Sequence, residues 1–467
     1  MTATALRVHG LSWVVTAFFI VADMVGGGVV AMPVAFLNTG LLVGLSFMLV
    51  ICVFFAYTAH LLGENWVIMQ ERWPQYREHC RKPYPEIALR SMGPRMKVAA
   101  SIIVYVTLFG TAVVYILLSS RIIQHLIASV FGAQIGFCYL LCVVSVAIMP
   151  LTYLKSPADF WLVIVVAMLC TICAVALIIL GVSFDMSACL SEVHYPPCRV
   201  SSAILSLGTF LFAFSGHHAF PTIQHDMKRP IEFSKSVVLG FIMVALLYMP
   251  LSVYGYVVYG DSMQSSVIDS VQTSWIRYAA DLSIAVHCIL TLIIMANPLN
   301  QQAEDLLNAS HAFGVERVMI RSCVLAAMLF CALTIPDFGP FMNLVGSTTI
   351  PVVCAALPSI CNLYLNASVF DQKAQKYTVP SLHDVFIRTN KVKLALNIFI
   401  ISVALIAGVV SAYLAIEEIT LVHFTPPCYL RPLLSAGGSY FNGELINCCG
   451  INRNIVAFGN ATNLCRP

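Results

Sequence analysis

Two short stretches of this sequence place polar groups inside long apolar runs. In the first, Asp23 stands three residues before Gly26, Gly27 and Gly28, and Pro33 follows five residues after the last glycine. Three glycines and a proline do not hold a regular helix. An unwound stretch would offer N–H groups to an anion such as a carboxylate, and carbonyls to a cation or an ammonium group. The alternative is tight helix packing through small residues.

The second stretch contains Phe214, Ser215, Gly216, His217 and His218, and a proline soon follows. Ser-Gly and then proline interrupt an apolar helix here, so the backbone of the first three residues becomes available to a ligand. Histidine titrates near physiological pH. Because neighbouring helical residues point about 100° apart, we expect at most one of the two histidines to face a cavity. A histidine bonded to a nearby carbonyl is the alternative for each.

A few other polar side chains lie within apolar segments. Asp23 is the one acid well inside the first segment, and a carboxyl at membrane depth is costly and commonly functional. We therefore expect it to carry a proton, unless it lies near the helix end and meets water. Tyr105 and Tyr115 could offer hydroxyls to a substrate or simply pack. His287 is a weaker candidate for proton transfer.

The composition indicates a membrane protein. Of 467 residues, 59% are hydrophobic and only 10% are charged, against about 25% charged in soluble domains. This excludes soluble enzymes, disordered scaffolds and nucleic-acid binders, and the net charge of +3 does not suggest a polyanionic partner. The sequence has neither a P-loop nor Cys/His metal spacing, so we expect no ATP-driven pump, no enzyme activity and no cofactor.

A helix needs about 20 apolar residues to cross a bilayer, and the long runs do not alternate as barrel strands do. The sequence predicts eleven spans, of which the fourth is short and the ninth is interrupted by Arg321. They cover residues 11–36, 40–63, 98–120, 136–151, 160–182, 202–222, 237–259, 277–296, 318–336, 341–365 and 392–416.

The positive charges predict the orientation. With the N-terminus inside, the cytoplasmic side holds 19 of the 25 Lys and Arg residues and the other side 6, as the positive-inside rule requires. The breaks fall in spans one and six, an odd offset of five, so the broken segments enter the membrane from opposite sides, which is typical of an inverted five-plus-five repeat. The predicted parts are a cytoplasmic N-terminus (1–10), a first repeat (11–182), a second repeat (202–365), span eleven (392–416) and an outside tail (417–467).

The cysteines predict disulfides on the outer side. Seventeen occur, and six fall outside the spans and away from the cytoplasm, an even number as pairing requires. Their connectivity stays open, with Cys189 to Cys198 a plausible short closure. We expect residues 417–467 to form a small disulfide-tied cap. Asn460 in this tail is the one usable glycosylation acceptor.

Three stretches resemble the amino acid/auxin permease family of eukaryotic amino acid transporters. They are the glycine-rich residues 26–33, residues 212–230 with the sixth-span break and a following Met-Lys-Arg-Pro, and residues 109–115. The resemblance covers about residues 11–416. It implies a fold like the bacterial leucine transporter, of the amino acid/polyamine/organocation superfamily, with an added eleventh helix. It also implies small amino acids as cargo and H+ or Na+ as the coupling ion.

One departure from the family pattern leaves the ion open. Sodium-coupled members typically place an Asn before the first glycine motif, whereas this chain reads Val21-Ala22-Asp23. The predicted function is secondary active transport of small neutral amino acids, driven by protons, with sodium possible. Apolar walls and only one deep acid favour a neutral cargo. The alternative is an amino-acid sensor that signals through its 64–97 loop with little transport, and a channel ranks third.

The sequence also predicts the surroundings of the protein. We expect a monomer in the lipid bilayer, with an amino acid as its small-molecule partner and no nucleic acid. The plasma membrane and an endolysosomal membrane both fit an oxidised outer face.

Overall fold

A computed structural model describes residues 10–78, 80–153, 160–309, 313–422, 425–430, 447–461 and 465. The predicted N-terminal segment 1–10 lies outside the described residues except for Gly10, and the tail 417–467 lies within them only in part.

The described chain is almost entirely helical, with one two-stranded antiparallel hairpin. The first half contains α1 (Trp13–Met24), α2 (Gly27–Thr39), α3 (Leu41–Arg72), α4 (Pro83–Met92), α5 (Pro94–Phe131), α6 (Phe137–Thr152) and α7 (Phe160–Cys189). The second half contains α8 (Val200–Ala213), α9 (Phe220–His225), α10 (Phe233–Tyr259), α11 (Val267–Ser270), α12 (Ser274–Leu306), α13 (Val315–Thr334), α14 (Phe338–Thr348), α15 (Leu357–Ala367), β1 (Phe370–Asp371), β2 (Lys376–Tyr377), α16 (Leu382–Arg388) and α17 (Lys391–Glu417).

Within the described residues, eight helices are long and apolar enough to cross a membrane, or nine when α1 and α2 count as one bent span. Each of the eleven predicted spans overlaps one of these helices or one of the shorter apolar helices α6 and α8. A multi-pass membrane protein is therefore confirmed. The count of eleven stays a prediction because α6 and α8 are short, and so do the repeat boundaries.

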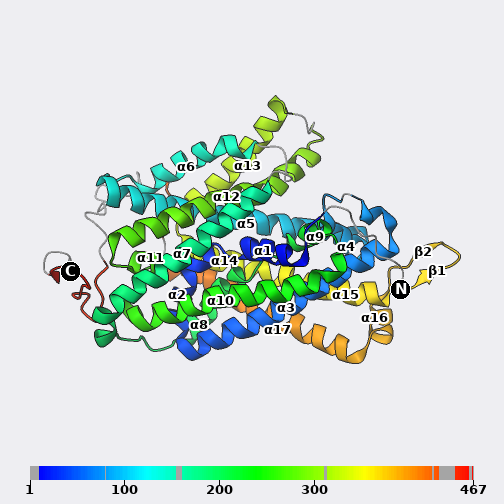
Figure 1. Cartoon of the computed structure of the whole chain (residues 1–467). Helices are drawn as coiled ribbons and strands as arrows, with labels where there is room; N and C mark the ends of the chain where they lie inside the picture. The colour runs from blue at the N-terminus through cyan, green and yellow to red at the C-terminus, as the bar shows by residue number, and fades with distance from the viewer. Residues whose placement is uncertain are drawn as a thin grey trace.

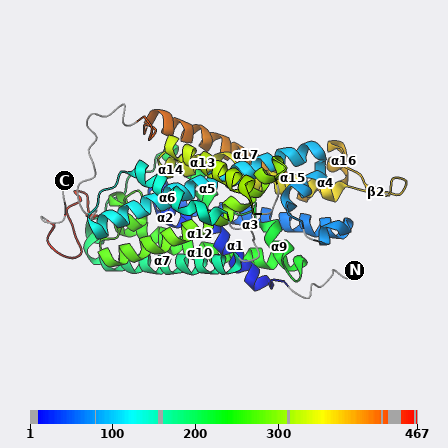
Figure 2. The same ribbon diagram turned by 90° about the horizontal axis from the view of Figure 1, so that it is seen from above.

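The long helices run along one common direction (Figures 1 and 2). We call the end that carries α11 and residues 447–461 the outer end, after the predicted orientation, and the opposite end, with α4, α9, α16 and the β1–β2 hairpin, the inner end. The broken helix lies in the middle of the bundle. There α2 packs against α8 and α10, while α1 packs against α10 and α7.

Local sequence signals explain where several helices begin. Ser381 caps α16 in a reciprocal capping box with Asp384, and Asn390 accepts from the first free N–H groups of α17. Gly93 takes a left-handed φ of +92° directly before Pro94, which opens α5.

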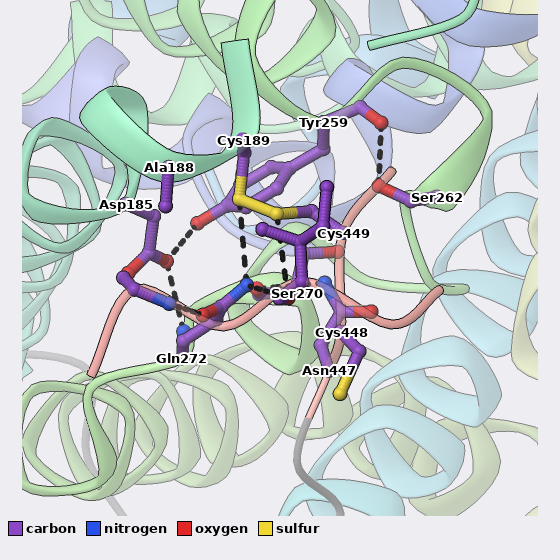
Figure 3. The surroundings of a disulfide bond; sticks show 12 residues. Asp185, Ala188, Cys189, Tyr259, Ser262, Ser270, Gln272, Asn447, Cys448 and Cys449 are labelled. Carbon is purple, nitrogen blue, oxygen red and sulfur yellow. Dashed lines mark hydrogen bonds between the residues drawn. A yellow bond between two sulfur atoms is a disulfide. The ribbon is translucent and has the colours of Figure 1, made fainter. Parts of the chain in front are cut away.

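The outer end is tied by disulfides, and one predicted pairing is wrong. Cys189 at the end of α7 is bonded to Cys449 in the tail, not to Cys198, which is free and exposed (Figure 3). A second disulfide, Cys448–Cys465, closes a loop within the tail.

The loop after α7 explains why Cys198 is not the partner. Residues 193–199 run along α10, where the Tyr195 hydroxyl donates to the Val257 carbonyl at 3.0 Å. Cys198 thereby reaches the turn at Gly40, which lies between α2 and α3. The spacing of nine residues between Cys189 and Cys198 suggested a short loop closed by a disulfide. Instead, residues 193–199 are held along α10.

A third disulfide corrects the assignment of cysteines to the membrane interior. Cys138, which falls within the fourth predicted span (136–151), lies in the first turn of α6 and is bonded to Cys428. The N–H of Cys428 donates to the Leu333 carbonyl near the end of α13 at 2.8 Å. The described parts of the tail are therefore fastened to the ends of α6, α7 and α13, and the cap itself stays a prediction.

A buried ion cluster joins three helices near the inner end. The Arg321 guanidinium of α13 lies 2.6 Å from the Glu304 carboxylate of α12, and Arg317 lies 3.6 Å from the same oxygen. Arg321 also donates to the Thr152 carbonyl at the end of α6 at 2.6 Å. All three charged side chains are at most 2% exposed. Arg321, which interrupts the ninth predicted span, is thus held by a counter-ion.

Replacing Glu304 should be costly, because two buried guanidinium groups would lose their carboxylate. We expect Glu304→Gln to lower the free energy of unfolding by about 3 kcal/mol, measured by thermal unfolding of the full chain in detergent. Glu232→Gln, which breaks the exposed Lys235–Glu232 pair, is the matched control and should change stability little. Equal losses in both variants would contradict this assignment.

Candidate functional site

The predicted interruption of the first span is present. Helix α1 ends at Met24, α2 begins at Gly27, and their axes are bent by 62°. Gly26 at the break has φ −150° and ψ −109°, far from helical values. Because the hydrogen-bond ladder stops here, the last carbonyls of α1 and the first N–H groups of α2 must find partners elsewhere.

The predicted interruption of the sixth span is present as well. Helix α8 ends at Ala213, and α9 begins only at Phe220. Tight turns fill the gap, in which Ser215 donates from both its N–H (3.1 Å) and its hydroxyl (2.7 Å) to the Phe212 carbonyl. Residues 214–217 of this gap are buried and 218–219 are partly exposed, so this backbone is irregular at depth within the bundle.

Both breaks converge on Tyr248 of α10. Its hydroxyl lies 3.1 Å from the Met24 carbonyl, at the end of α1, and 3.3 Å from the Ala213 carbonyl, at the end of α8. The ring is fully buried and lies edge-on to Phe214. A single O–H, the donor of one proton, is therefore shared between the open ends of two half-helices.

The three glycines face different surroundings. A side-chain carbon on Gly26 would overlap the Tyr115 hydroxyl and lie 2.8 Å from His287 Nε2. One on Gly28 would lie 2.7 Å from the Tyr248 hydroxyl and 2.8 Å from the Ala213 Cβ. The backbone at these two positions can approach polar groups only because there is no Cβ.

Gly27 is different, because it has room. A side-chain carbon there would meet Leu118, Phe212 and Phe338 at 3.6–3.8 Å, ordinary contact distances. The wall beside Gly27 is therefore apolar, whereas the walls beside the other two glycines carry hydroxyls and an imidazole.

Asp23 and His218 are brought together across the two breaks. His218 Nε2 lies 3.9 Å from Asp23 Oδ1, and their side chains are only 6% and 10% exposed. Asp23 is the penultimate residue of α1, but this helix end is buried in the bundle. Asp23 Oδ2 and His218 Nδ1 have no hydrogen-bond partner among the described residues. The two groups lie within ion-pair distance of each other across the breaks but, at 3.9 Å, are not hydrogen-bonded.

His217 points elsewhere, as expected for neighbouring residues. Its Nε2 lies 3.1 Å from both the Thr58 hydroxyl and the Phe55 carbonyl of α3. His217 is therefore the alternative that the sequence left open, a histidine hydrogen-bonded to a nearby carbonyl and not one that faces a cavity. His287 is similarly held, with Nδ1 2.8 Å from the Thr171 hydroxyl and 3.0 Å from the Ala167 carbonyl, yet its other nitrogen faces Gly26.

The structure does not bring Tyr105 to the breaks. It precedes Tyr115 by ten residues in α5, which is about 15 Å along the helix axis, and it lies toward the inner end. Tyr115 is the tyrosine of this helix that reaches Gly26. Phe214 lies at the second break, but its ring is fully buried and stacks on Phe241 at 6.5 Å.

The sequence reasoning missed Tyr248, because one tyrosine in an apolar span carries no distinguishing pattern. It also undercounted the deep acids. Asp185, Asp281 and Glu304 are buried too, but the first two lie toward the outer end and Glu304 is paired at the inner end. Near the breaks, Asp23 is the acid that contacts both segments. Among the described residues, no three His, Cys, Asp or Glu side chains gather to hold a metal ion.

The fold is shared with two solved structures. The chain superposes on the crystal structure of MhsT in complex with L-phenylalanine with a TM-score of 0.52 (10% identity, 88% of this chain and 100% of that one). It superposes on the inward-facing conformation of Mhp1 with the same score (12% identity, 94% and 100%). The predicted all-α fold resembling the bacterial leucine transporter is confirmed.

The sequence places the chain more narrowly. Residues 9–412 match the family described as transmembrane amino acid transporter protein, and the chain belongs to this family. Curated relatives from Arabidopsis thaliana include Amino acid transporter AVT1C (23% identical, 84% of this chain, 67% of the relative) and Amino acid transporter ANT1 (22%, 74% and 83%). With AVT1B the match is 24% identical and spans about half of the relative's length, 53%. The predicted family is confirmed.

Two of the glycines form a matched pair for mutation. Gly28→Ala should lower the free energy of unfolding by about 1–3 kcal/mol, because the new methyl group would press against the Ala213 Cβ and the Tyr248 hydroxyl. Gly27→Ala should change stability much less. Thermal unfolding of both variants checks this, and a greater loss for Gly27→Ala would contradict the geometry of the break.

Proposed function

We propose that this chain is a secondary active transporter of small neutral amino acids, and that the two helix breaks form its substrate site. The names of its relatives support amino acids as the class of cargo. The substrate would lie against Gly26, Gly27 and Gly28 on one side and Ser215 and Gly216 on the other.

One observation carries the proposal, namely that the carbonyls of Met24 and Ala213 aim at the same hydroxyl. One O–H cannot fully satisfy two carbonyls, whereas an ammonium group has three donors. On the other side of the same break, the first N–H groups of α2 are free of helical partners and suit a carboxylate. A zwitterion complements both ends of this break at once.

A neutral cargo fits the charges around the site. Asp23 is the acid beside the breaks, and His218 lies against it. The surroundings of Gly27 are apolar, formed by Leu118 and two phenylalanines. An amino acid with a charged side chain would therefore lack a counter-ion there.

The Asp23–His218 pair supports coupling to protons, with sodium as the alternative ion. Both side chains are nearly buried, and they belong to the two segments that bind the substrate in this proposal. Movement of either segment would change the distance between carboxylate and imidazole, and thereby the affinity of the pair for a proton. His217, hydrogen-bonded to Thr58 and Phe55 of α3, plays no part in this scheme.

The proposed setting follows the sequence analysis. The chain would act as a monomer with its N-terminus in the cytoplasm, in the plasma membrane or an endolysosomal membrane. Asn460, exposed at the outer end, would carry a glycan.

The coupling proposal is tested with the full chain in liposomes. Uptake of labelled alanine, serine and proline is measured with an imposed pH gradient and, separately, an imposed sodium gradient. Asp23→Asn should abolish the response to the pH gradient, because an amide carries no exchangeable acid proton, and retain exchange of amino acid across the membrane. Asp281→Asn, a buried acid away from the breaks, is the control.

The outcomes separate the alternatives. An unchanged pH response in Asp23→Asn would contradict proton transfer at this residue, and an equal loss in both variants would indicate damage to the fold. Saturable stabilisation by an amino acid without any flux would favour a sensor over a carrier.

The Tyr248 hydroxyl should matter for substrate affinity. Tyr248→Phe leaves two buried carbonyls without their donor and loosens the ends of α1 and α8, so we expect the KM for uptake to rise about tenfold. Tyr254→Phe, on the same helix but bonded to Ser183 at an exposed position, is the control. An unchanged KM in Tyr248→Phe, with normal thermal unfolding, would contradict the role of this hydroxyl.

A further inference from the structure

The tail beyond the family match returns to the outer end and binds there. Residues 447–457 lie against the end of α7 and the segment that links α11 to α12 (Figure 3). The covalent attachment is Cys189–Cys449. Asn447 adds a hydrogen bond from its amide to the Ser270 carbonyl at 2.9 Å and accepts one from Gln264 at 3.1 Å.

Gln272 is the centre of these contacts. Its side-chain oxygen accepts from the Ala457 N–H at 2.6 Å, and its amide group points at the Cys189 sulfur at 3.4 Å. Its own N–H donates to Asp185 of α7 at 2.9 Å, and that carboxylate also accepts from the Tyr259 hydroxyl of α10 at 2.6 Å. Tail, α7, α10 and the α11–α12 link are thus fastened at one residue.

Helix α11 in turn covers the outer half of the broken helix. It packs on α2, and its four residues are all buried. Val267 and Pro33 of α2 meet at Gly255 of α10, where a side-chain carbon would lie 3.2 Å and 3.4 Å from them. Helix α2 therefore cannot move outward from α10 unless α11 moves with it or detaches.

A second, weaker attachment holds α11 on its other side. The Asp269 carboxylate of α11 lies 2.8 Å from Nδ1 of His125 in α5. The side chains of Asp269 and His125 are 10% and 12% exposed. This contact is a single pair between side chains. The tail, by contrast, adds several hydrogen bonds anchored by a covalent bond.

We propose that residues 447–457 are a covalent latch that keeps α11 seated over the outer half-helix α2. The latch fixes the α11–α12 link to α7, so that opening of the outer end requires α11 to separate from α2 while its far side stays fixed. Breaking the latch frees α11 and makes opening of this end faster. The consequence for transport rests on the proposed function, whereas the latch itself does not.

The latch is tested by amide hydrogen exchange of the purified full chain. In Cys189→Ser/Cys449→Ser, the amides of residues 264–273 should exchange about tenfold faster, since the tail that holds this segment by hydrogen bonds loses its covalent attachment to α7 and the segment opens more often. Cys448→Ser/Cys465→Ser is the matched control, because it removes a disulfide of the same tail that does not reach α7. It should leave exchange of 264–273 within about twofold of the wild type.

A variant that keeps every disulfide shows whether faster exchange comes from the lost tail contacts or from misfolding of a protein that lacks a disulfide. Gln272→Ala removes the hydrogen bonds to the tail and should raise exchange of the same amides by a smaller factor, without changing exchange in α13. Unchanged exchange of 264–273 in both Gln272→Ala and the Cys189/Cys449 variant would overturn the latch. So would equal acceleration in the two double-cysteine variants, or acceleration spread over the whole chain.

Uptake in liposomes separates the latch from the transport proposal. With the latch broken, the initial rate of uptake from the outer side should rise, about twofold or more if opening of this end limits the cycle. Faster amide hydrogen exchange in the variant, with no uptake by the variant or the wild type, would support the latch and contradict the transport proposal. Uptake by the wild type together with unchanged hydrogen exchange in the variants would support the transporter and contradict the latch.

Discussion

The structure depends on how backbone carbonyls are satisfied where two helices stop inside the bundle. In a bilayer, a carbonyl without a donor costs several kcal/mol, because no bulk water is present to replace the lost hydrogen bond. At the ends of α1 and α8 the Tyr248 hydroxyl is the shared donor. One hydroxyl proton cannot fully satisfy two carbonyl oxygens, so these carbonyls can still accept hydrogen bonds. A ligand with several N–H donors can supply them. The glycines bring the second half of the site close, because they have no side chain to hold the helices apart.

Most of the fold was predictable from the sequence, because lipid imposes a simple rule on composition. Long apolar runs with few charges indicate spans, and Gly-Gly-Gly and Ser-Gly within them, each followed by a proline, favour breaks that are tolerated inside protein. Helix geometry also predicted that at most one of the two adjacent histidines would face the site. Which histidine it was depended on the turn at Gly216, and that turn is set by packing against α1 and α3.

The rest could not be read from the sequence, for reasons that specific residues make plain. Tyr248 looks like any aromatic residue of an apolar helix, and only its position between two chain ends makes it special. Cys189 and Cys198 are close in sequence, but Tyr195 holds the intervening loop along α10, so the pairing is decided by tertiary contacts. Glu304 and Arg321 lie on different helices, and only their meeting makes two buried charges tolerable.

The central claim is that the two breaks together bind both charged groups of an amino acid. It is tested most directly by the thermal unfolding temperature of the purified full chain with neutral L-amino acids, among them alanine, and with propionate and ethylamine, which each keep one charged group of alanine. The account predicts saturable stabilisation by at least one amino acid and none by either fragment. Equal stabilisation by a fragment and its parent amino acid, or none by any neutral amino acid, would contradict it.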